Sequence, residues 1–247
     1  MTVELSVFQK HLLSTGHSFL VSQLPQGLLP STDLFDDLWA LHPDEYHAIK
    51  IHGRLAKTPR WQQAYGRDYY YTGRVNRAKP VPASVRPYLT WAREVIHPNL
   101  NGALLNWYDG GRDHYIGRHR DSITGLAKGA PIVTISFGER RTFRLRRWKE
   151  PGDRVDFTAD HGTVFVMPCD TNLAWWHEVP VSRKLRGRRI SLTIRAFEPE
   201  CQRSSEPAYS SHLVMRRVLR DGSRAYRGPF AGPPELGSPP QHLSRSP

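Results

Sequence analysis

The sequence has little cysteine and no long apolar segment. Its only cysteines among 247 residues, Cys169 and Cys201, lie in no CxxC or Cys/His pattern, which excludes a disulfide framework and a cysteine-based zinc site. No basic amino terminus precedes an apolar segment, and no run reaches about 18 apolar residues. We therefore expect a protein that is not secreted and does not bind membranes, in the cytoplasm of a prokaryote or the nucleus of a eukaryote.

Acidic residues are also scarce relative to basic ones. The chain has 35 Lys and Arg against 23 Asp and Glu, a formal net charge of +12. Residues 1–49 carry a net charge of −5, residues 50–80 carry +7 and residues 102–199 carry +6. When clustered lysines and arginines contact the phosphates of a nucleic acid, the counterions condensed on those phosphates are released, which favours binding. The charge pattern therefore favours a polyanionic partner such as nucleic acid. We also expect the protein to be a monomer.

The apolar periodicity changes along the chain. Capping residues and helical spacing predict helices over 32–41 and 87–96. Farther along, a period of two predicts strands over 104–108, 131–137, 142–148, 163–167 and 189–197. Strands without intervening helices indicate a closed or double-sheet β architecture, so the fold class is mainly β, with some α.

Composition divides the chain into three parts. Residues 1–49 form an acidic helical or extended lead-in, and residues 50–199 hold the main domain. From residue 200 to 247, proline, serine, glycine and arginine dominate. Such a segment buries too little apolar surface to offset its ordering entropy, and we expect it to be mostly disordered.

A histidine and an aspartate lie two residues apart in GRHRDSITG. Residues two apart in a strand face the same side, so His119 and Asp121 can direct a nitrogen and an oxygen to one point. Alone, this motif is as well explained by a solvated strand end. His177, in NLAWWHEVP, is a candidate third ligand, because two histidines and a carboxylate form the facial triad of non-haem Fe(II) oxygenases. The alternative is a core histidine packed between tryptophans.

The segment RISLTIR alternates polar and aliphatic residues. If its aliphatic face packs in the core, Arg189 and Arg195 point into a pocket and can pair with the two ends of a dicarboxylate. A half-exposed strand with surface arginines is the alternative. Asn106 and Tyr108, which share one face of LLNWY, can supply further hydrogen bonds to such a ligand.

Four ordered blocks together resemble the AlkB family of Fe(II)/2-oxoglutarate dioxygenases. They are NWYDGGRDHYIGRHRD, GAPIVTISFGERRTFRLR, HGTVFVMPCDTNLAWWHEVP and RRISLTIR, and the resemblance runs from about Lys50 to Phe197. It is closest to the branch that repairs alkylated bases in duplex DNA. The resemblance implies a double-stranded β-helix, or jelly roll, with Fe(II) as cofactor and 2-oxoglutarate and O2 as cosubstrates.

The resemblance also implies roles for individual residues. It places iron on His119, Asp121 and His177, and 2-oxoglutarate against Arg189 and Arg195. Asn106, Tyr108 and Ser191 would assist in binding the cosubstrate; Ser191 stands where some relatives have asparagine.

Residues 50–80 correspond to the family's nucleotide-recognition lid. In it, Arg60 suits a phosphate and Tyr71 matches the aromatic residue that stacks on a flipped base. His52 stands where duplex-repair relatives carry an apolar side chain that fills the gap left by the flipped base. Two further positions lie beyond the lid. Arg183 and Lys184 resemble a loop that holds the duplex backbone, and Ile123 replaces a common acidic contact to the base, so base preference stays open.

These observations predict oxidative dealkylation of N-alkylated nucleobases, such as 1-methyladenine and 3-methylcytosine, in DNA. One alternative is a dioxygenase of the same class that acts on RNA or protein, which the changes at His52 and Ile123 favour. A non-catalytic nucleic-acid-binding module is the other alternative, and only the charge supports it.

Overall fold

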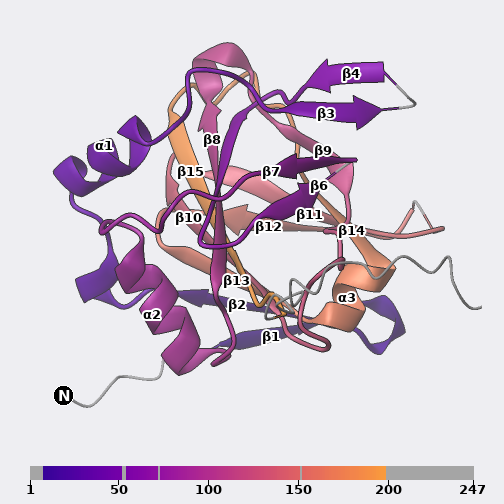
Figure 1. The fold of residues 1–247 in the computed structure, drawn as a ribbon. Helices are drawn as coiled ribbons and strands as arrows, with labels where there is room; N and C mark the ends of the chain where they lie inside the picture. Colours follow the sequence, from indigo (N-terminus) through magenta and orange to yellow (C-terminus); the bar gives the residue numbers. More distant parts are fainter. Residues whose placement is uncertain (1–7, 52–53, 72, 151, 199–247) are drawn as a thin grey trace, which may run out of the picture. The chain divides into compact units, whose positions relative to one another are not determined.

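Two antiparallel sheets face each other in the structure, a computed structural model that describes residues 8–51, 54–71, 73–150 and 152–198 (Figure 1). The larger sheet has the strand order β1-β2-β13-β10-β15-β8-β5, and the smaller has the order β12-β11-β14-β9. This arrangement confirms the expected mainly β, jelly-roll architecture. The expected disordered tail, residues 200–247, lies outside the described residues, as does His52.

The strands have the following bounds. The larger sheet contains β1 (Gln9–Leu12), β2 (Ser18–Gln23), β5 (Trp61–Tyr65), β8 (Gly102–Asp109), β10 (Ile132–Gly138), β13 (Thr163–Met167) and β15 (Arg188–Arg195). The smaller contains β9 (Ile116–His119), β11 (Arg141–Arg147), β12 (Arg154–Ala159) and β14 (Trp175–Val179). Two separate hairpins pair β3 (Ala48–Ile51) with β4 (Arg54–Lys57), and β6 (Tyr69–Tyr71) with β7 (Arg74–Asn76).

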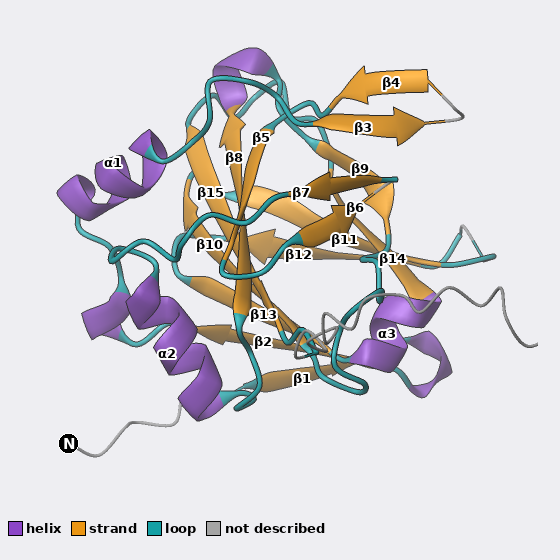
Figure 2. Cartoon of the chain, in the orientation of Figure 1, coloured by secondary structure: helices purple, strands orange, loops and turns teal. Residues whose placement is uncertain are grey.

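Helices α1 (Thr32–Ala40) and α2 (Arg86–Val95) pack on the outer face of the larger sheet (Figure 2). Both coincide with helices predicted from the sequence. The Ser31 hydroxyl caps α1 by accepting a hydrogen bond from the Leu34 amide at 3.2 Å, and a proline lies in the first turn of α2. The short helix α3 (Cys169–Ala174) directly precedes β14. No helix in the described ranges is long and apolar enough to span a membrane.

Strand β15 separates an aliphatic core from a polar interior. It is hydrogen-bonded to β10 on one side and to β8 on the other along most of its length. Its residues Ile190, Leu192 and Ile194 are buried in the core cluster that includes side chains of α1 and α2. Because side chains alternate along a strand, Arg189, Ser191, Thr193 and Arg195 point between the two sheets. The aliphatic face therefore packs in the core, as the alternation predicted.

The segment before residue 50 contributes strands to the larger sheet. Strand β2 pairs antiparallel with β13, and β1 pairs with β2 at the sheet edge. Phe19 of β2 is fully buried and stacks on Phe143 of the smaller sheet, with ring centroids 5.7 Å apart. The amino-terminal strands thus close one end of the space between the sheets.

Candidate metal centre and its pocket

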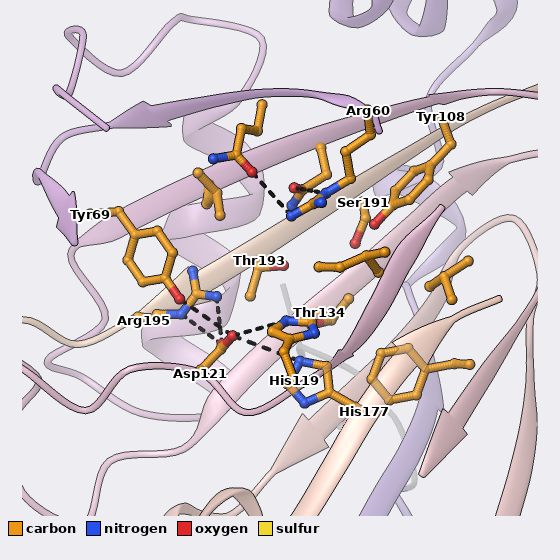
Figure 3. Close-up of a pocket in the computed structure, with 16 residues that line it drawn as sticks. Arg60, Tyr69, Tyr108, His119, Asp121, Thr134, His177, Ser191, Thr193 and Arg195 are labelled. Atoms are coloured by element: carbon orange, nitrogen blue, oxygen red, sulfur yellow. Dashed lines mark hydrogen bonds and ion pairs between the residues drawn. The ribbon is translucent and has the colours of Figure 1, made fainter. Parts of the chain in front are cut away.

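Two histidines and an aspartate converge at one end of the smaller sheet (Figure 3). Strand pairing places His177 of β14 directly opposite His119, the last residue of β9. Asp121 follows two residues later, where its Oδ1 lies 3.6 Å from His119 Nε2 and 3.7 Å from His177 Nε2. Ligand atoms of the three residues lie within 4.8 Å of one another. The structure therefore brings together the three residues that the sequence predicted as metal ligands.

The imidazole rings are oriented by their surroundings. His119 Nδ1 lies 2.9 Å from the Gly117 carbonyl oxygen, a contact that orients the ring with Nε2 toward Asp121. Phe143 stacks on His177 with an interplanar angle of 16°. Burial lowers the pKa of His177 to about 3, so this imidazole is neutral at physiological pH. His177 thus offers the neutral form that binds a metal.

Asp121 is held as a carboxylate by its neighbours. Burial raises the pKa of this carboxyl group, but Arg195 and the two histidines outweigh burial and hold the pKa well below its usual range. Arg195 donates from Nε and Nη2 to Asp121 Oδ2 at 2.9 and 2.5 Å, whereas Oδ1 faces the histidines. The donor set of two imidazoles and one ionised carboxylate fits a facial Fe(II) site.

Asn172 fixes the backbone that carries Asp121. Its Oδ1 accepts a hydrogen bond from the Asp121 amide at 3.0 Å, and its Nδ2 donates to the Asp121 carbonyl at 3.1 Å. Asn172 lies in α3 and is 1% exposed. This reciprocal pair ties the helix to the loop after β9 and limits the positions that the carboxylate can reach.

Substituting alanine for Asn172 is expected to lower metal affinity by roughly 10- to 100-fold, as for other residues that orient metal ligands. The measurement is a Mn(II) titration of the metal-free protein. Asn101→Ala is a matched control, because Asn101 makes the same reciprocal pair with the Phe197 backbone, at 2.8 Å in both directions. Equal metal affinities in the two variants would contradict a role for Asn172 in positioning Asp121.

Arg189 forms a buried cationic site next to the pocket. The side chain is 1% exposed and stacks over Tyr108, with its guanidinium carbon 4.9 Å from the ring centroid. Nη2 donates to Ser136 Oγ at 2.8 Å, while Nε and Nη1 are buried and have no hydrogen-bond partner among the described residues. Burial lowers the pKa of Arg189 to about 10, yet the group stays charged at pH 7. A buried cation with unpaired donors fits a carboxylate ligand, as 2-oxoglutarate would supply.

Arg60 organises two amide side chains in the pocket. Its Nε donates to Asn106 Oδ1 at 2.8 Å, and its Nη2 donates to Gln62 Oε1 at 3.0 Å (Figure 3). Both amide oxygens are thereby occupied. Gln62 Nε2 is buried without a partner among the described residues and lines the same pocket as Asn106. Arg60 is 3% exposed, so it lies inside the pocket wall and not on the surface of the lid.

Ile123, Arg183 and Lys184, which were also predicted to contact substrate, are not among the residues that line this pocket. Tyr71 is the last residue of β6. Ile123 is 51% exposed in the loop after Asp121. Arg183 and Lys184 are exposed in the loop between β14 and β15.

This basic loop passes very close to the turn after β8. A Cβ atom added to Gly110 would lie 2.5 Å from the Leu185 carbonyl oxygen, so only glycine permits this approach. The Gly110 amide donates to the Gly187 carbonyl at 3.0 Å. The contact fixes the base of the loop that carries Arg183 and Lys184.

The sequence analysis missed three polar residues at this site. They are Gln62, Asn172 and Tyr69, whose hydroxyl donates to Asp121 Oδ1 at 3.4 Å. Tyr69 begins a run of three tyrosines, and strand alternation could have separated it from its neighbour Tyr70, which is 46% exposed. No local sequence signal distinguishes Gln62 or Asn172, because each acts through partners that are distant in sequence.

The fold and the site together define a class of protein. A jelly roll that directs two histidines and a carboxylate into a pocket, beside a buried arginine, is the arrangement of a 2-oxoglutarate-dependent iron oxygenase. Residues 41–195 match the family model described as the 2OG-Fe(II) oxygenase superfamily. The chain therefore belongs to this superfamily, as a member of its AlkB family.

Individual relatives support the same assignment. The chain is 32% identical to the DNA oxidative demethylase ALKBH2 of Mus musculus over 161 residues, 61% of this chain and 67% of that protein. It is 32% identical to the ALKBH2 protein of Bos taurus, over 64% of this chain and 60% of that protein. It is also 32% identical to the alpha-ketoglutarate-dependent dioxygenase alkB homolog 3 of Rattus norvegicus, over 64% of this chain and 56% of that protein. The chain thus spans roughly three fifths of the length of these relatives.

The solved structure of OsALKBH1 superposes with a TM-score of 0.51 over 76% of this chain and 99% of that one. At 15% identity, this likeness supports the fold alone. Family membership confirms Fe(II) as the cofactor and 2-oxoglutarate and O2 as cosubstrates, as the sequence predicted.

Proposed function

We propose that this protein removes alkyl groups from nucleobase nitrogens by oxidation, coupled to the conversion of 2-oxoglutarate to succinate and CO2, and so repairs alkylated DNA. The observation that carries the proposal is the triad of His119, Asp121 and His177. It lies beside the buried guanidinium of Arg189, of which Nε and Nη1 have no hydrogen-bond partner among the described residues. A module that only binds nucleic acid has no need for this alignment. The names of the relatives, DNA oxidative demethylases, support the same reaction and DNA as substrate.

The triad would hold Fe(II), which supplies activation of O2 for decarboxylation of 2-oxoglutarate and for hydroxylation of the N-alkyl carbon. The two atoms of O2 enter succinate and the hydroxylated alkyl group. For a methyl group, the C–N bond of the resulting N-hydroxymethyl base then breaks. Formaldehyde leaves as the hydroxyl proton passes to solvent, and the ring nitrogen of 1-methyladenine or 3-methylcytosine keeps the electron pair of the broken bond as its lone pair.

The residues around the pocket would position the reactants. Arg189 and Tyr108 would bind one carboxylate of 2-oxoglutarate. Because Arg60 donates to the amide oxygen of Asn106, the amide nitrogen of Asn106 would donate to the cosubstrate. Ser191 also lines the pocket. Arg195 would act through Asp121, by holding Oδ2 and leaving Oδ1 for the metal. The pocket thus divides into a site for the cosubstrate and a site for the metal.

The target base would enter from the side of the two hairpins. A base must leave the helical stack to reach a buried metal centre, and unpairing costs least for a damaged base. Lys50, Arg54 and Lys57 give hairpin β3-β4 a positive charge suited to phosphates. Tyr71 would stack on the extruded base. His52, which lies outside the described residues, would fill the gap that this base leaves in the stack. Arg183 and Lys184 would contact the phosphate backbone of the DNA.

A protein with this function works in the nucleus of a eukaryote or the cytoplasm of a prokaryote.

Formaldehyde and succinate release measured on defined substrates tests this function. With Fe(II) and 2-oxoglutarate, we expect both products from oligonucleotides that contain 1-methyladenine or 3-methylcytosine, in a one-to-one ratio. Unmethylated oligonucleotides of the same sequence are the control and should yield no formaldehyde. Release only from methylated tRNA or from a methylated peptide would move the function to RNA or protein. Release from none of these substrates, with DNA binding intact, would contradict the proposal.

A further inference from the structure

A surface groove lies directly beside the metal centre. It is lined by the segment 118–124, which joins β9 to the loop after Asp121, and by residues of α3 and β14. His119 and Asp121 line both this groove and the pocket, so the two are adjacent. The groove volume of about 510 Å³ lies within the range of about 300 to 1,000 Å³ that is usual for small-molecule sites. It is thus large enough to hold a group of nucleotide size.

Two arginines that line this groove lie over tryptophan rings. The guanidinium carbon of Arg118 lies 4.2 Å from the ring centroid of Trp176, and that of Arg120 lies 3.9 Å from the centroid of Trp148. Lys149 Nζ approaches the Trp148 ring at 4.9 Å. Such pairs hold a positive charge against an aromatic surface that is left partly open to solvent.

Exposed apolar side chains continue the same surface. Ile123 is 51% exposed, Leu173 is 45% exposed and Trp148 is 41% exposed. Arg120 donates to the Leu173 carbonyl at 2.6 Å, and the Trp148 amide donates to the Ala174 carbonyl at 2.9 Å. These bonds fix the surface as one unit. We call it the groove patch, formed by Arg118, Arg120, Ile123, Trp148, Leu173 and Trp176.

The positive charges of the groove patch are available to a ligand. Within the described ranges, neither Arg118 nor Arg120 forms an ion pair with a carboxylate. On the same smaller sheet, by contrast, Arg144 pairs with Asp156, and Arg146 pairs with Glu178. Unneutralised cations beside exposed apolar side chains match a ligand that carries both anionic groups and flat apolar faces.

We propose that the groove patch binds an unpaired nucleotide segment adjacent to the target base, so that the preferred substrate is single-stranded nucleic acid. In a duplex the faces of neighbouring bases are stacked inside the helix, whereas in a single strand they are free to contact Trp148, Leu173 and Ile123. Arg118 and Arg120 contact the intervening phosphates. This inference rests on the proposed function, which supplies the nucleic acid and the position of the target base.

Binding of unmodified DNA tests the groove patch without turnover. The measurement is fluorescence anisotropy of the full chain with a labelled twelve-nucleotide single strand and with its duplex. Trp148→Ala combined with Leu173→Ser is expected to weaken single-strand binding roughly tenfold, the loss expected from stacking on one base. Duplex affinity is expected to stay within twofold of the unsubstituted protein. Leu12→Ser, which changes a 75% exposed leucine of β1, is the matched control and should alter neither affinity.

The salt dependence of binding tests the charges. Arg118→Gln is expected to lower the slope of log affinity against log salt by about one unit for the single strand. Arg93→Gln removes the same charge from the exposed side of α2, on the outer face of the larger sheet, and should leave the slope unchanged. Equal slopes in the two variants would overturn the assignment of phosphate contacts to the groove patch.

The outcomes separate the groove patch from the proposed function. Unchanged single-strand affinity in the Trp148/Leu173 variant, or equal losses on single strand and duplex, would overturn the inference even if methylated DNA is dealkylated. A selective loss of single-strand affinity would support the groove patch even if no methylated nucleic acid releases formaldehyde. In that second case only the proposed reaction would fail.

Discussion

Replacing Asp121 with alanine is expected to abolish succinate release from 2-oxoglutarate while binding of DNA persists. The substitution removes one of three metal ligands, and we expect metal affinity to fall by more than the roughly 100-fold that results from loss of a residue orienting a ligand. The measurements are a Mn(II) titration and succinate release with Fe(II). Affinity for unmodified DNA, measured by anisotropy, depends on surface cations and should change less than twofold.

The same substitution also affects folding, because Arg195 is 3% exposed and its ion pair is with Asp121. Removing one partner of a buried ion pair costs about 3 to 5 kcal/mol. Asp121→Asn is therefore the second variant, since its amide oxygen can still accept a hydrogen bond from Arg195. We expect this variant to melt cooperatively and still fail to release succinate. Succinate release at the unsubstituted rate in a folded Asp121→Asn protein would exclude Asp121 as a ligand.

The second large effect is expected at Arg189, where methionine should raise the KM for 2-oxoglutarate by roughly 100-fold or more. The guanidinium is fully buried with two unpaired nitrogens, and loss of a buried charge partner costs about 3 kcal/mol or more. Arg189→Lys keeps the charge but not the fork geometry, and should recover part of the affinity. Calorimetry of 2-oxoglutarate with the Mn(II)-loaded protein measures binding without turnover.

Arg188→Met is the control on the same strand. Arg188 points to the opposite face, where it pairs with Asp36 and lies over the ring of Trp39. Its loss should lower the melting temperature without changing the KM for 2-oxoglutarate. If both variants bound 2-oxoglutarate as the unsubstituted protein does, the cosubstrate site would have to lie elsewhere.

Strand periodicity explains how much of the site was predictable. The alternation in RISLTIR required one face in the core, and Ile190, Leu192 and Ile194 do pack there. The same alternation placed Arg189 and Arg195 between the sheets. Their individual roles were not predictable, because only the tertiary fold brings Asp121 to Arg195 and leaves Arg189 without a carboxylate partner among the described residues.

The net charge of a segment predicted the positions of individual arginines less well than strand periodicity did. Arg54 and Arg60 belong to the same basic segment, yet Arg54 is exposed and Arg60 is 3% exposed behind two amides. Burial of an arginine depends on acceptors that come from other strands, here Asn106 of β8. Asn172 shows the same limit, since its partner Asp121 lies 51 residues away. Interactions between distant segments are therefore the part of the site that sequence patterns do not encode locally.

Strand β9 is an edge strand of the smaller sheet, and among the described strands it pairs with β14 alone. Its register with β14 contains two residue pairs, His119 with His177 and Ile116 with Val179. The register shifts between His177 and Val179. A metal ion coordinated by both histidines would cross-link β9 and β14 at this edge of the sheet. Metal binding and closure of this edge are then thermodynamically linked, so the ion that serves the chemistry also stabilises the native state.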